Sequence, residues 1–288
     1  MDISSGIVSF RSTCPGSLMQ DLLRDRPDQV RKITRFQTTF SSRRVIYECE
    51  LPCEDLGTVY NFIKSIDALE ELAVRNYEPD VSSLWQAIFH HAKSLRSLSI
   101  HTPPQVDEGF QTWTPASVAA LNSELPSLQH LEMDISLTEA ESFLDSPGDL
   151  TSLALIGAAT QLAQPESILI NIPLRDAASS FAGEHTWNVM GAIDFPEPKK
   201  QVCERFAVAM LDKFPAGAKK LQIRLTRRCW DDRFQYTTLG YSVTAVRDPE
   251  GKVTVETDKK WGYYLMAAPE YEGFLWKLMM KYRNEHGW

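Results

Sequence analysis

Several features that would place a protein quickly in a functional class are missing from this 288-residue sequence. No stretch approaches the roughly 18 consecutive apolar residues of a membrane-spanning helix, so we expect no membrane contact. Neither G-x-G-x-x-G nor G-x-x-x-x-G-K-S/T occurs, which argues against a Rossmann enzyme and a P-loop NTPase. Residues 1–6 lack the basic start and apolar core of a signal peptide, and this favours a cytoplasmic or nuclear protein.

Cysteine is also scarce, and basic residues are outnumbered by acidic ones, 30 to 38. The five cysteines, an odd number scattered along the chain, do not resemble a disulfide framework and fit a reducing compartment. Cys49 and Cys53 lie close together, but no second pair completes a zinc site, so we expect no metal and no cofactor. A formal net charge of −8 argues against a nucleic-acid partner.

A short phrase, L-x-x-L-x-L with an aliphatic last residue, returns four times along the chain. It occupies residues 69–74, 95–100, 128–133 and 150–155. In a strand its fourth and sixth residues point to one face, and units stacked side by side bury that face in a continuous core. Such repeats are typical of leucine-rich repeats, whose period is about 20–29 residues, although the spacing here is irregular.

The segments around these phrases carry helix signals. Asp80 can cap a helix with an apolar stripe, and Thr114-Pro115 combines a cap with proline at the first helical position. Residues 136–139 fit the capping-box pattern. Apolar spacing predicts further helices at 18–23, 56–66 and 198–211.

The rest of the chain predicts additional strands. An atypical first strand should begin at residues 30–33, and residues 44–51 alternate like an edge strand. Further strand patterns cover 167–174, 219–225, 241–247, 252–257 and a third C-terminal strand from 262. A hairpin signal joins 241–247 to 252–257, and residues 271–282 form an amphipathic helix pattern.

These patterns together predict an α/β fold. We expect an irregular leucine-rich-repeat-like solenoid with a mainly parallel curved sheet, closed by a C-terminal β-meander and helix. It should form a single domain with an N-terminal cap (1–55), degenerate αβ repeats (56–225) and a C-terminal cap (226–288). The expected buried residues are Leu72, Val74, Leu98, Ile100, Leu131, Met133, Leu153, Leu155, Leu221 and Ile223.

Residues 83–100 and 125–133 resemble the leucine-rich-repeat regions of fungal F-box-type proteins. The resemblance spans residues 55–156, with a weaker echo at 199–225. In that family an N-terminal F-box docks a substrate receptor onto a ubiquitin-ligase scaffold, and the repeats hold the substrate. Residues 1–50 lack the Leu-Pro-containing helical F-box pattern. The resemblance is therefore confined to the repeats, and it implies the repeat architecture and a role in holding a protein.

The residues that flank the buried strand positions should project from an exposed, concave face. The expected set is Glu71, Ala73, Arg75, Ser97, Ser99, His101, His130, Glu132, Asp134, Ser152, Ala154, Ile156, Lys220, Gln222 and Arg224. Within this set, we expect binding to depend on Arg75, His101, His130, Glu132, Asp134 and Arg224. A face that is merely solvated is the alternative interpretation.

A second region suggests a different function, an enzyme of an uncommon class with its site between the repeats and the C-terminal meander. Its residues would be Arg227, Trp230, Asp231 and Arg233, where basic and aromatic side chains could hold a phosphate or carboxylate. A surface ion-pair network is the competing explanation in so acidic a chain.

The sequence therefore favours a non-catalytic protein-recognition module, with a substrate-receptor role implied by the resemblance. No catalytic residue is assigned. The identity of the partner and the oligomeric state stay open.

Overall fold

The computed structural model describes residues 9–12, 16–39, 56–75, 81–101, 113–135, 154–174, 197–215, 217–231 and 234–264. The helices are α1 (Gly16–Asp25), α2 (Pro27–Val30), α3 (Leu56–Lys64), α4 (Val81–Phe89), α5 (Pro115–Glu124), α7 (Ala154–Ala159) and α9 (Glu197–Lys213). The strands are β1 (Ser9–Ser12), β2 (Arg35–Thr39), β3 (Glu71–Arg75), β4 (Ser97–His101), β5 (His130–Asp134), β6 (Ser167–Leu174), β7 (Lys220–Asp231), β8 (Phe234–Arg247) and β9 (Val253–Tyr264).

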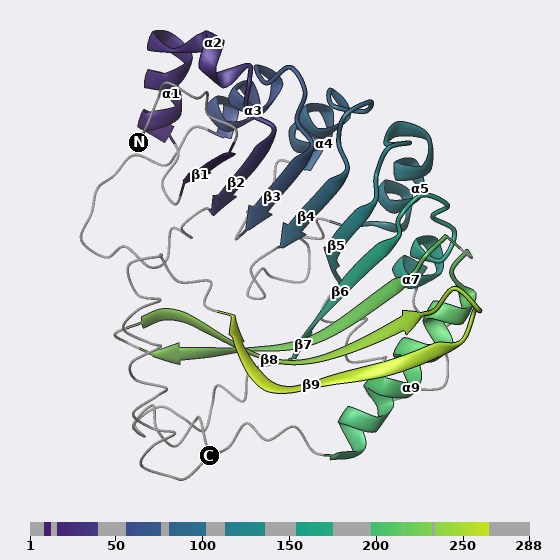
Figure 1. Ribbon diagram of the computed structural model, residues 1–288. Helices are drawn as coiled ribbons and strands as arrows, with labels where there is room; N and C mark the ends of the chain where they lie inside the picture. Colours follow the sequence, from purple (N-terminus) through teal and green to yellow (C-terminus); the bar gives the residue numbers. More distant parts are fainter. Residues whose placement is uncertain are drawn as a thin grey trace.

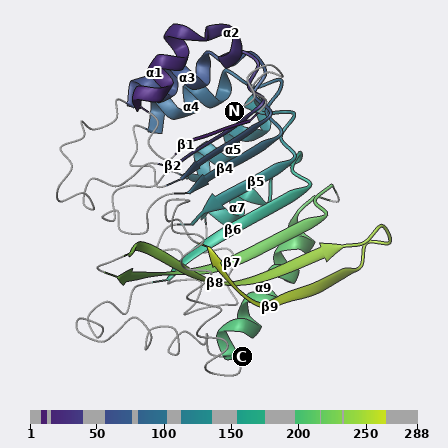
Figure 2. The same ribbon diagram turned by 60° about the vertical axis from the view of Figure 1, so that its left-hand side comes forward.

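The described strands form one nine-stranded sheet in which spatial order follows sequence order. Strands β1 to β7 pair in parallel, whereas β8 and β9 are added antiparallel. The strands follow an arc with the helices on its outer side (Figure 1), and the turned view shows the same arrangement (Figure 2). A mixed α/β fold with a mostly parallel sheet is thus confirmed.

The core lies between the sheet and these helices, and two rows of aliphatic side chains cross the strands to build it. Parallel pairing aligns the phrase residues strand by strand. One row holds Leu72, Leu98, Leu131, Ile168 and Leu221, and the other holds Val74, Ile100, Met133, Ile170 and Ile223. All ten are buried in one hydrophobic cluster, which confirms the predicted burial of the eight that the sequence had named.

A repeated hydrogen-bond pattern marks the start of the parallel strands and fixes this register. The Glu70 carbonyl accepts from two consecutive N–H groups of the next repeat, those of Arg96 at 2.8 Å and Ser97 at 2.9 Å. The carbonyls of Thr34, Arg96, Gln129 and Glu166 each accept from the next strand in the same way. The described repeats from β2 to β7 therefore share one backbone junction, although their connecting segments differ in length.

The helix prediction at Thr114-Pro115 is confirmed in detail. The Thr114 hydroxyl accepts from the Ser117 N–H at 3.0 Å, and the Ser117 hydroxyl accepts from the Thr114 N–H at 2.9 Å. This reciprocal capping satisfies donors that the first turn of α5 would otherwise leave unpaired.

The predicted strand at 150–155 is wrong where the structure describes it, because residues 154–159 form helix α7. Leu155, Ile156 and Ala159 are buried at helical spacing, and the phrase L-x-x-L-x-L is compatible with a helix as well as a strand. The place in the sheet between β5 and β7, which the phrase at 150–155 was expected to fill, belongs instead to β6, whose Ile-rich segment has stronger strand propensity.

The predicted first strand at 30–33 is also wrong. Pro27 begins helix α2 in its first turn, where its missing N–H is no loss, and Val30 is buried at the end of that helix. The strand β2 begins later, at Arg35. Pro27 therefore marks the start of a helix.

The C-terminal meander extends the sheet and does not close it, which corrects the predicted closure. The hairpin at 248–251 is confirmed, and Gly251 adopts the positive φ of 86° that its turn requires. Strand β9 runs without interruption to Tyr264, so no separate third strand begins at 262. The predictions at 44–51, 136–139 and 271–282 lie outside the described residues.

Arg247 ties the end of α9 to the antiparallel strands. Its guanidinium donates to the carbonyls of Pro215 at 3.1 Å and Ala218 at 3.2 Å, and also to that of Leu211. Because the last carbonyls of a helix lack partners within the helix, this arginine caps α9 and anchors it to β8.

We expect Leu98→Ala to lower the free energy of unfolding by about 2–5 kcal/mol, because it leaves a cavity at a fully buried position in the row. Arg96→Ala, two residues away and exposed, should change it by less than about 0.5 kcal/mol. Urea denaturation measures both. Equal effects of the two substitutions would contradict the packing described here.

A pH dependence follows from His91. Its Nε2–H donates to the Ile63 carbonyl at 2.9 Å, whereas its buried Nδ1 has no hydrogen-bond partner in the described part of the chain. Burial lowers the pKa of His91 below its ordinary value, and the neighbouring His90 adds to this, against a smaller opposing effect of the Ile63 carbonyl.

The pKa of His91 is lower in the folded chain than in the unfolded chain. As the pH falls below about 6.5, His91 is therefore protonated in the unfolded chain before it is protonated in the folded chain. The stability contribution of neutral His91 should be complete above that pH and decline below it. In urea titrations at a series of pH values between about 7.5 and about 5, the His91→Gln variant should show a smaller decline in the free energy of unfolding than the parent protein. An equal decline in the His91→Gln variant and in the parent protein would contradict this assignment.

Candidate functional site

The candidate site is the face of the sheet opposite the helices, called the open face below. Alternation along each strand places on it the residues that lie between the core positions. The amino-end row holds Arg35, Glu71, Ser97, His130, Ser167 and Lys220. The middle row holds Gln37, Ala73, Ser99, Glu132, Leu169 and Gln222. The carboxyl-end row occupies positions Thr39, Arg75, His101, Asp134, Asn171, Arg224 and Ser242.

The amino-end row is exposed and carries charges of both signs. Arg35 Nε lies 3.0 Å from a carboxylate oxygen of Glu71, across β2 and β3. His130 and Lys220 are exposed on β5 and β7. At the adjoining edge Lys219 Nζ donates to Glu166 at 2.9 Å, and this lysine is the main cause of the lowered pKa of the Glu166 carboxyl. This row can therefore meet a surface of mixed charge.

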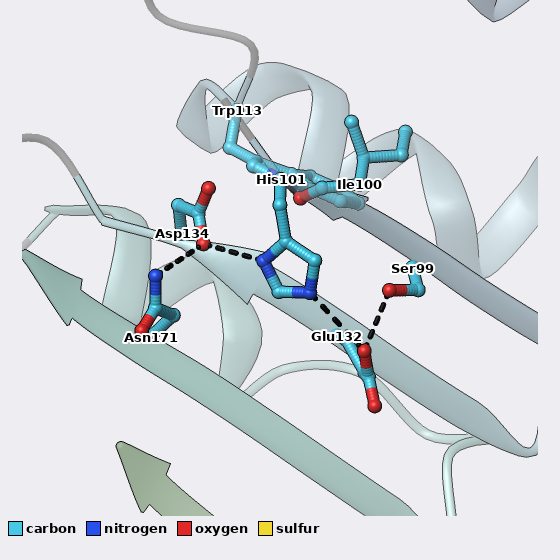
Figure 3. A network of polar contacts seen from close by, with 7 residues as sticks. All are labelled: Ser99, Ile100, His101, Trp113, Glu132, Asp134 and Asn171. Carbon is cyan, nitrogen blue, oxygen red and sulfur yellow. Dashed lines mark hydrogen bonds and ion pairs between the residues drawn. The ribbon is translucent and has the colours of Figure 1, made fainter. Parts of the chain in front are cut away.

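In the carboxyl-end row, in contrast, His101, Asp134 and Asn171 are buried and hydrogen-bonded across the strands (Figure 3). His101 is 1% exposed and Asp134 is 7% exposed. His101 Nδ1 lies 2.8 Å from Asp134 Oδ1, and His101 Nε2 lies 3.1 Å from Glu132 Oε2. Ser99 Oγ donates to the same Glu132 oxygen at 2.6 Å, and Asn171 Nδ2 donates to Asp134 at 2.9 Å. Side chains of β4, β5 and β6 are thereby joined.

Hydrogen-bond direction decides the ionic state of this network. A carboxylate can only accept, so both nitrogens of His101 donate when Glu132 and Asp134 are ionised, and the ring is then an imidazolium between two anions. The Asn171 amide must likewise present its nitrogen to Asp134. Its Oδ1 then points away and has no hydrogen-bond partner among the described residues.

The arrangement does not form a nucleophile–base pair. A serine nucleophile needs its hydroxyl hydrogen-bonded to a histidine nitrogen that can take the proton. Here the Ser99 hydroxyl donates to Glu132, and both His101 nitrogens face carboxylates. Across the described ranges, no group of three metal-binding side chains has a geometry that could hold a metal ion. The described network therefore holds neither a serine–histidine pair nor a metal-binding group.

The Glu132 carboxylate connects the buried and exposed parts of the face. Its side chain is 34% exposed, and one of its oxygens is held by Ser99 and His101. Two hydrogen bonds from buried neighbours restrict its rotamers before any partner arrives. A partner that binds it would consequently pay less of the usual side-chain ordering entropy.

The structure brings the predicted binding residues onto one face, with differences in exposure. His130 is exposed and Glu132 partly exposed, as expected. The expectation that His101 and Asp134 are exposed is wrong, because their neighbours on adjacent strands satisfy them within the fold. Arg75 and Arg224 occupy the predicted carboxyl-end positions. Ala154 and Ile156 belong to α7 and not to the face, and Ser152 lies outside the described residues.

The alternative site is spread along the β7–β8 hairpin. Arg227, Trp230 and Asp231 are residues of β7, and Arg233 lies outside the described residues in the connection to β8. Sequence reasoning missed Asn171 and Ser242, although a polar Asn171 within the apolar run of β6 was a signal that its side chain needed a partner.

Comparison with known proteins adds no assignment: no family model matches the chain, and no curated protein matches it. None of the helices described here is both long and apolar enough to span a membrane.

We expect Asp134→Ala to destabilise the fold by about 3–5 kcal/mol, since it leaves the buried His101 ring and the Asn171 amide without their acceptor. Glu132→Ala removes a partly exposed carboxylate from the same network and should cost about 1 kcal/mol. Denaturant titration of both variants tests this order. A larger loss in the Glu132 variant would show that the network is not organised around Asp134.

Proposed function

We propose that this protein is a non-catalytic recognition module that holds a protein partner on its open face, in a repeat array of the leucine-rich-repeat type. The observation that supports this proposal is the alignment of polar side chains from β2 to β7 into rows, with contacts between side chains of β2 and β3 and of β4, β5 and β6. Such a surface is rigid and pre-organised for association.

The charge pattern indicates the kind of partner. The amino-end row carries Arg35 and Glu71 on β2 and β3, and His130 and Lys220 on β5 and β7. Complementary charges at such a rim act mainly on specificity and association rate. A folded protein surface with charges of both signs fits this row better than a uniformly charged polymer such as a nucleic acid.

The repeat relationship is part of the same proposal. The shared backbone junction and the aligned aliphatic rows support an array of structurally equivalent units. On the resemblance to fungal F-box-type repeat proteins, the bound protein would be a substrate of a larger assembly. The partner surface would then be the open face, as in other arrays whose concave side is used for binding.

Charge reversal can test this face because the chosen side chains are exposed. We expect Glu71→Lys combined with Lys220→Glu to weaken partner capture from a cell extract at least about tenfold, which corresponds to 1.4 kcal/mol. The melting temperature should stay nearly unchanged, since exposed ion pairs contribute at most about 1 kcal/mol. Reversal of the buried Asp134 is unsuitable, because it would destabilise the fold itself.

The matched control reverses exposed charges on the helices, with Glu124→Lys on α5 and Lys213→Glu on α9. Capture should survive this control. Amine cross-linking of the captured complex gives an independent result: the partner should attach to Lys220 on the open face and not to Lys93 or Lys213 on the helical side. Loss of capture in the control variant, with cross-links at Lys213, would place the interface on the helices and refute the proposal.

A further inference from the structure

Strand β9 forms one margin of the sheet (Figure 2). Among the described residues it pairs only with β8, and its regular part spans Val253 to Asp258, opposite Arg247 to Ser242. Beyond Asp258 the register shifts, with extra residues on β9 before pairing resumes at Gly262. The regular edge is therefore short and ends at a bulge.

Backbone groups of alternate residues point away from the sheet along this edge. The Arg247 N–H donates to the Lys219 carbonyl of β7 at 2.8 Å. Because hydrogen bonds on a strand alternate between its two neighbours, Arg247 and its opposite residue on β9 form a non-hydrogen-bonded pair. The residues of β9 whose N–H and C=O groups then point outward are Val253, Val255 and Thr257.

The edge also exposes apolar surface at its centre. Val255 is 36% exposed and is one of only two large hydrophobic side chains that are exposed among the described residues. It lies opposite Ala245, on the side of the sheet that α9 covers, at the outermost strand. An outward-facing backbone and an exposed valine therefore coincide at one residue.

We propose that β9 pairs antiparallel with β9 of a second copy of this chain, about a two-fold axis at Val255, so that the two sheets become one. In this register Val255 lies opposite Val255 of the second copy, and Val253 lies opposite Thr257. The outward-pointing residues on both sides meet as hydrogen-bonded pairs, as an antiparallel ladder requires. Each copy contributes the same surface, which is the condition for a closed two-fold dimer.

Charge complementarity selects this register over its neighbours. In this register Lys252 of each copy lies opposite Asp258 of the other, so the two-fold axis generates two such pairs. Glu256 lies opposite the neutral Thr254. Moving the axis to Glu256 would place two glutamates opposite each other, which is unfavourable. Opposite charges thus flank a β-branched centre.

Size-exclusion chromatography with light scattering, over a concentration series of the full chain, tests the dimer. The mass should rise from 32.7 kDa toward twice that value as concentration increases. Val255→Pro should abolish the rise, because it removes the central outward N–H and leaves the bonds between β8 and β9 intact. Val255→Thr, which keeps the backbone donor and the branched shape, should still dimerise.

Two further variants keep the test decisive if the proline substitution perturbs folding. Val255→Glu places like charges on the axis and should also give a monomer, with an unchanged circular dichroism spectrum. Lys252→Asp should weaken the dimer, and adding Asp258→Lys should restore it. A mass of 32.7 kDa at every concentration, or a dimer that survives Val255→Glu, would overturn the proposal.

Discussion

The stacking of aliphatic rows against the helices is the constraint on which the rest of the structure depends. Leu98 and Ile100 have aliphatic neighbours on both adjacent strands, so the apolar side chains of each strand pack against those of the next strand. The carbonyl that accepts from two N–H groups at each junction keeps successive strands in this register. A slip of one residue would exchange the core side chains for the polar ones on the open face.

The open face is a consequence of the same register. Since alternate residues point to opposite sides, the alignment that builds the core also aligns the polar residues into rows. The rows differ in exposure because their side chains find different hydrogen-bond partners within the fold. Arg35 and Glu71 meet as an exposed pair, whereas His101, Asp134 and Asn171 satisfy one another and can be buried together.

The change from parallel to antiparallel pairing after β7 gives the sheet two unlike ends. The antiparallel strands are long, and Arg247 links them to the end of α9. At the far margin, an outward-facing row of backbone groups on β9 has no partner strand among the described residues and lies beside an exposed valine. Native proteins usually protect such edges with charge, bulges or pairing. Here the regular stretch of β9 is bounded by a bulge and by oppositely charged residues, which suits pairing in a single register.

Local sequence was sufficient for the elements whose side-chain period and end signals agree. The strands at Leu72, Leu98 and Leu131, the capped helix after Thr114 and the hairpin ending at Gly251 could all be predicted, because short-range spacing and backbone preference specify them. The α/β class and the identity of the core face follow from the same patterns.

Tertiary structure determined the outcome in two kinds of case. In one, a sequence pattern was compatible with either a helix or a strand; in the other, the exposure of a residue depended on neighbours far away in the sequence. The phrase at 150–155 suits helix or strand, and packing of Leu155 and Ile156 beneath the sheet selects the helix. Whether a polar strand residue is exposed cannot be read from its own strand. His101 is buried because residues about thirty positions away on β5 supply its partners, as cross-strand pairing permits. Whether the meander closes the sheet or extends it likewise depends on β7 accepting β8 along its whole edge, a long-range choice that no local spacing records.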